Sequence, residues 1–213
     1  MSKFTRFVLW AVGIIAVVVA VLRLTLFESW VIPEDDSWLS ASLEPTLRGG
    51  DAVLLLVRGT PGFGDLVRCA DPDDPSGYVV GRIVGLAHDT VDVRGSSLRV
   101  NGTSYNSTEA CEQREFTVEH PDTGAEVVFN CGRVDLGGTW HFRGASLKHK
   151  ASDNKKHTIG EGQAFLLSDN RTLHVDSRDF GTVEIATCNA RVVYRFWGRD
   201  GWSDSSRRLS LIR

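Results

Sequence analysis

The first residues that could support catalysis are hydroxyl side chains beside a proline. Ser40, Ser42 and Thr46 lie within the sequence SASLEPT, and the turn sequence Arg-Gly-Gly-Asp follows at residues 48–51. A serine becomes a nucleophile when a neighbouring base takes its proton. Because most serines in such turns only cap or bend the chain, this run needs partners from elsewhere in the sequence.

Two further groups carry charged and basic side chains that could serve as such partners. Residues 81–89 read GRIVGLAHD, a strand pattern that ends in a tight turn. Residues 168–181 read SDNRTLHVDSRDFG and place aspartates, arginines and a histidine at close spacing. A plain polar loop would rarely hold so many groups that hydrogen-bond to one another. These three groups form the candidate site.

An apolar segment precedes the candidate site. Residues 7–27 read FVLWAVGIIAVVVAVLRLTLF, with Arg23 as the one charge. As a helix, they would span roughly 31 Å, about one hydrocarbon core. A cleaved signal peptide has a shorter apolar run and a small-residue exit site, whereas this run continues into Leu-Thr-Leu-Phe-Glu-Ser-Trp. The sequence therefore predicts an uncleaved transmembrane anchor.

Charges on the two sides of this segment predict its orientation. Lys3 and Arg6 precede it, and Glu28, Glu34 and Asp35 follow it. Positive charge flanks the cytoplasmic end of such helices. We expect residues 1–6 in the cytoplasm, one pass of the cytoplasmic (inner) membrane, and residues 28–213 outside, where disulfides are stable.

The rest of the chain has the pattern of strands and turns. Short apolar runs separated by Gly, Pro, Asp and Asn predict strands at residues 52–57, 65–69, 78–86, 91–93, 98–100, 164–167 and 192–197. Residues 116–119 and 125–130 alternate around the turn Pro-Asp-Thr-Gly at 121–124, which predicts a hairpin. No helical period is sustained after residue 30. The expected fold class is mainly β, with packed or coiled antiparallel sheets.

Composition excludes several classes of protein. The 24 Lys+Arg and 27 Asp+Glu give a net charge of −3, so nothing indicates a nucleic-acid partner. None of the four cysteines lies in a C-x-x-C pair, which argues against structural zinc. Cys111 and Cys131 flank the hairpin, and the sequence is compatible with a disulfide between them or with two thiols. Cys69 and Cys188 lie in strand-like runs and are interpreted as small buried apolar residues.

In chain order, the motifs resemble those of type I signal peptidases (leader peptidases), which are membrane-bound serine endopeptidases. The resemblance rests on SLEPTL at 42–47, GDLV at 64–67, RIVGL at 82–86 with Asp89, VNG at 100–102, DNR at 169–171 and DSRDFG at 176–181. It implies a coiled antiparallel β-sheet catalytic domain against the outer membrane surface. Residues 103–160 would be the variable β insertion of the family.

The resemblance also implies roles for individual residues. Ser42 would attack the scissile carbonyl, and the Ser42 backbone N–H and the Ser40 hydroxyl would form the oxyanion hole. Such donors contribute roughly 3–4 kcal/mol each. Val80 and the strand before Ser42 would line shallow pockets for the Ala-x-Ala residues of the substrate. The residues of the surrounding scaffold are Gly81, Arg82, Asp169, Asn170, Asp176, Ser177 and Arg178.

One departure from the family concerns the general base. The family has a lysine just before Arg82, whereas this chain has Gly81, which cannot accept a proton. The family often has a serine, in contact with that lysine, at the position of His174. We therefore hypothesise a Ser42–His174 dyad, with Gly81 leaving volume for the imidazole, because histidine titrates near neutrality. His88 is a weaker candidate base.

A carboxylate is expected to complete this arrangement. Asp176 could orient His174, but pairing with Arg82 and Arg178 is the favoured role for its carboxylate. Pairing of this kind would hold the loop in place rather than act on the base.

The predicted function is removal of N-terminal signal peptides from exported preproteins. The alternatives are an impaired member that binds signal peptides without cleaving them, and a structural subunit. No metal-ligand spacing or phosphate-cradling glycine loop occurs, so no metal or cofactor is expected. The expected partners are signal peptides and membrane lipid, with the secretion translocon as a further candidate. The arginines of residues 191–213 suit either solvent or anionic headgroups.

Overall fold

The computed structural model describes residues 2–74, 76–146, 148 and 154–213. The helices are α1 Lys3–Leu26, α2 Ser37–Leu43 and α3 Ser177–Phe180, with short 3-10 turns at Ile185–Thr187 and Ser205–Arg207. The strands are β1 Phe27–Val31, β2 Ala52–Leu56, β3 Leu66–Ala70, β4 Tyr78–Gly85, β5 Thr90–Arg94, β6 Ser97–Val100, β7 Thr103–Ser104, β8 Glu109–Glu119, β9 Glu126–Leu136, β10 Thr139–Ala145, β11 Asn154–Thr158, β12 Gln163–Leu167, β13 Val183–Glu184, β14 Ala190–Trp197 and β15 Ser210–Leu211. The mainly β prediction is therefore confirmed.

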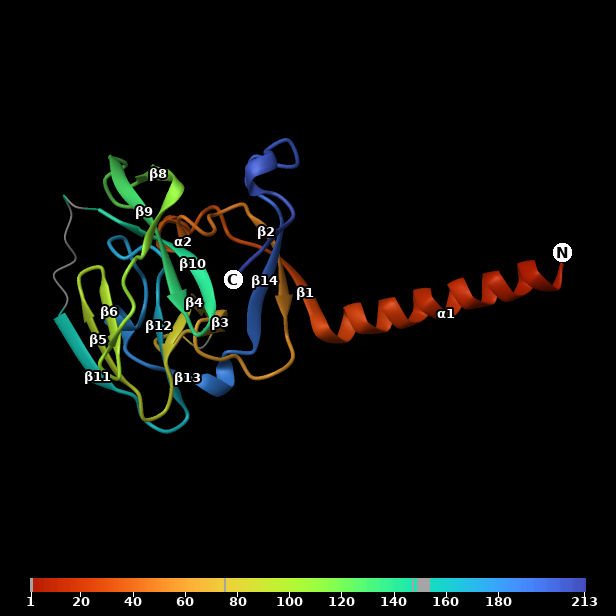
Figure 1. Cartoon of the computed structure of the whole chain (residues 1–213), viewed down its shortest axis with the longest axis horizontal. Coiled ribbons are helices and arrows are strands. Elements are labelled where there is room, and N and C mark those ends of the chain that lie inside the picture. The colour runs from red at the N-terminus through yellow and green to blue at the C-terminus, as the bar shows by residue number, and fades with distance from the viewer. Residues whose placement is uncertain (1, 75, 147, 149–153) are drawn as a thin grey trace.

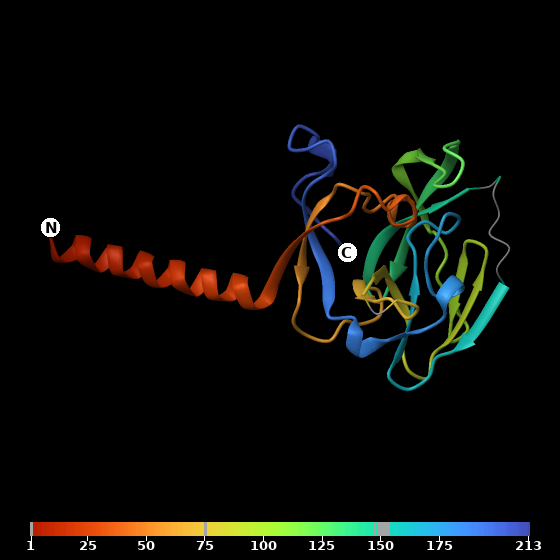
Figure 2. The same ribbon diagram turned by 180° about the vertical axis from the view of Figure 1, so that it is seen from behind.

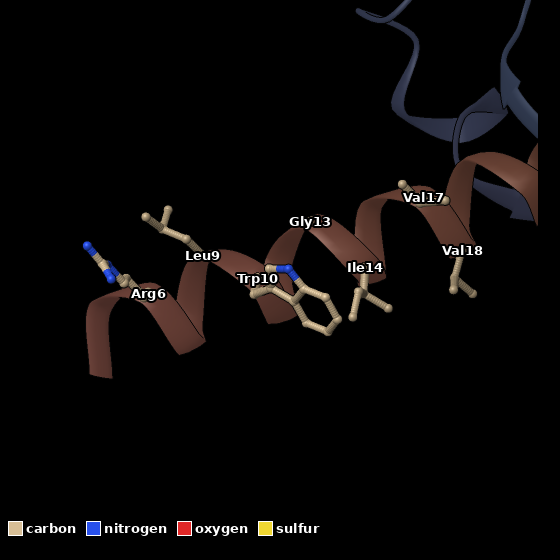
Figure 3. Close-up of a pocket in the computed structure, with 7 residues that line it drawn as sticks. All are labelled: Arg6, Leu9, Trp10, Gly13, Ile14, Val17 and Val18. Atoms are coloured by element: carbon tan, nitrogen blue, oxygen red, sulfur yellow. The ribbon is translucent and has the colours of Figure 1, made fainter. Parts of the chain in front are cut away.

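Helix α1 projects from the β body as one long rod (Figure 1). Its 24 residues include no buried side chain, and it is long and apolar enough to cross a membrane. A shallow hollow along the helix, lined among others by Trp10, Ile14 and Val18, faces outward (Figure 3). Apolar side chains exposed over this length suit a lipid environment rather than water.

The strands form three antiparallel sheets. The largest has the order β1-β2-β14-β3-β4-β12-β13, with β15 added beside β14. A second sheet has the order β10-β9-β8, and a third β11-β5-β6-β7. Figure 2 shows the smaller sheets on the side of the body away from α1. Residues 103–146, which include most of the expected insertion, form strands β7 to β10, whereas residues 147 and 149–153 lie outside the described part.

Strand β4 is central to the large sheet and carries the second candidate group. It lies between β3 and β12, and every residue after Tyr78 is buried. Burial on both faces explains the almost continuous apolar sequence, in which Arg82 is the exception. That exception needs internal partners, because a buried guanidinium without them would be costly.

The predicted hairpin is confirmed, and the structure decides the open question of the two cysteines that flank it. Strands β8 and β9 pair around residues 120–125, and Cys111 is bonded to Cys131. Both strands are longer than predicted, because each continues into polar residues that alternation alone did not assign.

The interpretation of Cys69 and Cys188 as unpaired core residues is wrong, because they form a second disulfide. Ala190 of β14 pairs with Arg68 of β3, which brings the neighbouring cysteines together. The two cysteines are 119 residues apart in the sequence, so no local pattern indicates their pairing.

Candidate active site

Ser42 lies in the last turn of α2. The helix begins after Asp36, whose side chain accepts a hydrogen bond from the Leu39 N–H at 2.8 Å. It ends before Pro45, which disfavours helical backbone in the preceding residue. Ser42 is fully buried, and its Oγ donates to the Leu39 carbonyl at 2.8 Å. The candidate nucleophile is therefore held on a short, capped helix.

Ser40 lies two residues before the candidate nucleophile, Ser42. Its Oγ accepts a hydrogen bond from the Gly49 N–H at 2.8 Å. A serine hydroxyl both accepts and donates, so this contact leaves the O–H proton of Ser40 available to a developing oxyanion. The contact also connects α2 to the turn at residues 48–51.

Asn170 connects α2 to the third candidate group. Its backbone N–H donates to the Ser42 carbonyl, and its Nδ2 donates to the Ala41 carbonyl, both at 3.0 Å. Its Oδ1 accepts from the backbone N–H groups of Thr172 and Leu173 at 3.1 and 3.0 Å. One buried amide therefore fixes the end of α2 and shapes the loop that leads to His174.

Asp169 and Arg82 form a buried bidentate ion pair. Arg82 Nε and Nη2 donate to the two carboxylate oxygens of Asp169, each at 2.9 Å, and Thr46 Oγ1 donates to Oδ2 at 2.6 Å. Burial alone would raise the pKa of Asp169, but Arg82 and these hydrogen bonds outweigh it and lower the pKa to about 2. The pair anchors β4 to the segment that carries Asn170.

Asp176 is also paired, but only in part as predicted. Its carboxylate accepts from Arg178 Nε and Nη2 at 2.9 and 2.6 Å and from the Ser168 N–H at 2.8 Å. Burial opposes ionisation, yet Arg178 lowers the pKa of Asp176 to about 2. The expected pairing with Arg178 is confirmed, whereas pairing with Arg82 is wrong, because Asp169 occupies the guanidinium of Arg82.

Ser177 supports the same loop. Its Oγ accepts a hydrogen bond from the Leu166 N–H of β12 at 2.9 Å, and its side chain is buried. This bond fixes the start of α3 against the strand next to β4. Ser177 therefore links α3 to β12, and its role in the scaffold of a catalytic site stays a prediction.

His174 is oriented by a different carboxylate from the one considered in the sequence. Its Nδ1 lies 2.8 Å from Asp179 Oδ2. The same oxygen accepts the backbone N–H of Asp176 at 3.0 Å as part of a capping box that begins α3. Because Asp176 is occupied by Arg178, Asp179 takes the orienting position, a role that the sequence reasoning missed.

His174, Asp176 and Asp179 present ligand atoms within 4.8 Å of one another. Such a group could hold a metal ion by spacing alone. The carboxylate of Asp176, however, already has Arg178 on both oxygens, and this positive charge opposes a cation. We therefore assign these side chains to the site and not to a metal.

The proposed dyad contact is not formed. Within the described residues, the hydrogen-bond partner of Ser42 Oγ is the Leu39 carbonyl. The volume expected at Gly81 is not there either, since a Cβ at this position would lie 3.0 Å from Leu166 Cβ and 3.5 Å from the Leu167 nitrogen. Strand β12 fills the space that the imidazole of His174 was expected to use.

Most of the chain matches one known protein family. Residues 5–197 match the family described as "Signal peptidase, peptidase S26". The chain belongs to this family. Signal peptidases of this type are serine endopeptidases, so the chain is a hydrolase of signal-peptidase type.

Relatives of this signal peptidase carry the same description. Signal peptidase I of Bacillus licheniformis is 29% identical over 171 residues, covering 78% of this chain and 74% of the relative. Signal peptidase I of Pseudomonas aeruginosa is 28% identical over 179 residues, covering 76% and 58%. A solved signal peptidase I from Enterococcus faecalis V583 matches with 24% identity and a TM-score of 0.38, covering 62% of this chain and 97% of that one.

His88 of this signal peptidase does not lie in a buried site. It occupies a turn with a φ of 73°, its side chain is 84% exposed, and its Nε2 lies 3.0 Å from Glu161 Oε2. These features give it a surface ion pair rather than a place beside a buried serine.

His141 is a buried histidine that the sequence reasoning missed. It lies on β10, inside the expected insertion, and its Nε2 is 3.6 Å from Asp169 Oδ1. Burial and the Arg82 guanidinium hold the pKa of His141 well below its usual value, although Asp169 opposes them. Only the packing of β10 against the Asp169 segment places His141 here.

Val80 is 2% exposed and packs in the same core cluster as Leu39 and Leu43 of α2. Strand β4, which carries Gly81, therefore packs directly against α2, which carries the candidate nucleophile. In this structure Val80 is a core residue, and its role in a substrate pocket stays a prediction.

Proposed function

We propose that this chain removes N-terminal signal peptides from exported preproteins, with Ser42 as nucleophile. The observation that carries the proposal is the pair of hydrogen bonds from Asn170 to the carbonyls of Ala41 and Ser42 in α2. They join the serine motif to the DNR motif inside a chain of the signal peptidase family. A scaffold without a site would not need this buried arrangement.

The proposed chemistry is acyl transfer through Ser42. Its Oγ attacks the scissile carbonyl carbon as the proton passes to His174, and the Ser40 hydroxyl donates to the oxyanion. The Ser42 N–H would donate as well once it leaves its place in the last turn of α2. The intermediate collapses when the peptide C–N bond breaks and His174 returns the proton to the leaving amine. Water then hydrolyses the ester by the same steps and restores Ser42.

His174 is the proposed base, with Asp179 as its positioning residue. A carboxylate on Nδ1 fixes the ring so that Nε2 carries the proton transfer. Reaching Ser42 requires its hydroxyl to leave the Leu39 carbonyl, a rotation that substrate binding would cause. Catalytic hydrogen bonds often tighten only in the complex.

The proposed location follows from charge and disulfides. Lys3 and Arg6 suit the cytoplasmic end of α1, and the β body would lie outside the cytoplasmic membrane. The two disulfides support an oxidising compartment. Signal peptides and membrane lipid are then the direct partners, with the translocon as a further one.

The location can be measured separately. Protease added outside intact spheroplasts is expected to digest the β body and to spare an epitope placed before Lys3. Protection of the β body would contradict the proposed orientation.

A preprotein with an Ala-x-Ala site, incubated in detergent with purified enzyme, tests the proposed function. We expect cleavage by the wild type and at least about a hundred-fold loss in Ser42→Ala and in His174→Ala. His88→Ala is the matched control and should match the wild type. If Ser42→Ala and His141→Ala lose cleavage activity while His174→Ala keeps it in full, His141 and not His174 would be the general base.

Binding without cleavage is the second candidate, and Gly81 is the observation that favours it. No cleavage by wild type at high enzyme concentration, together with retained peptide binding, would establish this reading. A serine-reactive acylating inhibitor separates the two, because only an activated Ser42 forms the adduct.

A further inference from the structure

The β8–β9 hairpin lies against the helix that carries the nucleophile (Figure 1). Its inner-face residues Val127 and Phe129 are buried in one cluster with Ala41 of α2 and Leu173. Ala41 precedes Ser42, and Leu173 precedes His174. The insertion therefore covers the two segments that supply the proposed dyad.

The tip of the hairpin is attached to α2 by Trp38. Its Nε1 donates to Asp122 Oδ1 at 2.9 Å, and its ring meets the His120 ring edge-on, with centroids 5.8 Å apart. The Asp122 N–H in turn donates to His120 Nδ1 at 3.2 Å, which stiffens the turn. The hydrogen bond from Trp38 lies at the surface and joins residues 84 positions apart.

Phe116 fills the middle of this contact. Its ring stacks on Phe129 with centroids 5.4 Å apart. A Cβ at Gly144 would lie 2.5 Å from Phe116 Cζ and 3.6 Å from the Glu44 carbonyl oxygen. The ring thus lies on the backbone of β10, close to the residue that ends α2.

The attachment of the hairpin to α2 is weak compared with its attachment to its own sheet. The α2 contact consists of a small apolar cluster and one exposed side-chain hydrogen bond. At the other end, Cys111 is bonded to Cys131, and β9 is paired with β10 from Asn130 to Leu136. Regions with few buried contacts open locally before the core does. The tip can therefore lift while β9, at the base of the hairpin, stays paired with β10.

We propose that the β8–β9 hairpin is a cover over the peptide-binding surface, and that an extended apolar peptide binds by displacing it from α2. Ser42 is fully buried in the covered state. Displacement would expose Ala41 and Leu173 as apolar surface beside the nucleophile, which suits the small apolar residues before a cleavage site. The proposal rests on the proposed function for the peptide class but not on the identity of the base.

Asp122→Ala in the full-length chain tests the cover, because it removes the hydrogen bond to Trp38 from an exposed position. The matched control is Glu115→Ala, which removes one carboxylate from the outward-facing side of β8. Three quantities are measured: the rate of Ser42 acylation by a small serine-reactive inhibitor, the affinity for a fluorescent peptide with an Ala-x-Ala site, and kcat/KM.

If the hairpin is a cover, Asp122→Ala should raise the acylation rate, the peptide affinity and kcat/KM about five-fold each. The reason is that one hydrogen bond such as Trp38–Asp122 stabilises the closed state by about 1 kcal/mol. The control should equal the wild type. The expected result includes faster proteolysis at residues 120–124 when the peptide is bound.

An unchanged or lower peptide affinity in Asp122→Ala, with the control at wild-type level, would overturn the cover and make the hairpin a fixed wall. Failure of the proposed function gives a different result. If neither the wild type nor any variant cleaves the peptide or is acylated, the peptide affinity still tests the cover. A five-fold higher affinity in Asp122→Ala would then support the cover although the proposed function has failed.

Discussion

At the scale of single residues, Asp179 is the carboxylate that would orient the proposed base, His174. Its carboxylate holds His174 Nδ1 at 2.8 Å and is itself held by the capping box of α3. Asp179→Asn should lower kcat by about ten-fold or more with little change in KM, because the ring loses its orientation. Steady-state cleavage assays measure this, with Glu184→Gln as the control. A matching loss in the control, or none in Asp179→Asn, would remove the positioning role.

Gly81 provides a second residue-scale prediction. Gly81→Lys introduces the lysine that the resemblance implied for this position, but its Cβ would lie 3.0 Å from Leu166 Cβ. We expect no gain in cleavage and a loss of about 1–3 kcal/mol in the free energy of unfolding, from overpacking between β4 and β12. Urea unfolding and the cleavage assay measure the two effects. A more active variant of unchanged stability would contradict the packing argument.

His141 predicts how stability depends on pH. Burial and Arg82 lower its pKa in the folded chain, so below about pH 6.5 the unfolded chain binds a proton that the folded chain does not. The free energy of unfolding should therefore fall as pH drops, by up to about 1.4 kcal/mol per pH unit. Urea unfolding of wild type and His141→Gln at pH 7.5 and 5.5 measures this. If the free energy of unfolding falls equally in both proteins between these pH values, titratable groups other than His141 cause the pH dependence.

At the scale of elements, the two disulfides join strands in different ways. Cys69–Cys188 closes a sequence separation of 119 residues between β3 and the segment just before β14, whereas Cys111–Cys131 closes 20 residues within the hairpin sheet. The loop-entropy argument gives the longer loop the larger effect on the unfolded chain.

Replacing both cysteines of a pair with alanine should therefore have unequal effects. We expect Cys69→Ala with Cys188→Ala to lower the free energy of unfolding by about 4–5 kcal/mol, and Cys111→Ala with Cys131→Ala by about 3 kcal/mol. Denaturant midpoints under non-reducing conditions provide the comparison. An equal or larger loss for the hairpin pair would show that native contacts, rather than loop closure, set the difference.

At the scale of the whole molecule, α1 and the β body are energetically separate. No side chain of α1 is buried, and its contacts with the body occur at its last turn, where the Val57 N–H donates to the Leu26 carbonyl and Arg23 Nη2 donates to Ser29 Oγ. Membrane attachment and folding of the β body should therefore respond to different changes.

Removal of residues 1–22, which leaves these contacts in place, should change the free energy of unfolding of the β body by less than about 1 kcal/mol. It should also abolish the transmembrane insertion of the chain, because the apolar length falls below what a bilayer requires. Carbonate extraction of membranes and urea unfolding measure the two outcomes. A truncated chain that no longer folds would show that α1 supports the body.

Most strands and the N-terminal helix were predictable from the sequence, because their signals are local. Neighbouring residues alone create these signals: the long apolar run of α1, the alternation around Pro121–Gly124, and the apolar runs that form β2, β3 and β4. The motifs around Ser42 and Asp169 were recognisable for the same reason, since their residues are contiguous. Short elements such as α2 and β1 carry too few residues for a period to emerge.

The partners within the site were decided by tertiary structure. Asp169 rather than Asp176 pairs with Arg82, because β4 lies beside β12 and the buried guanidinium meets the carboxylate that the end of β12 presents. Asp179 reaches His174 only after α3 forms its capping box. The sequence by itself determined the apolar helix, most of the strands and the motifs that carry the family resemblance. Which charges meet and which cysteines bond depend on contacts between segments far apart in the chain.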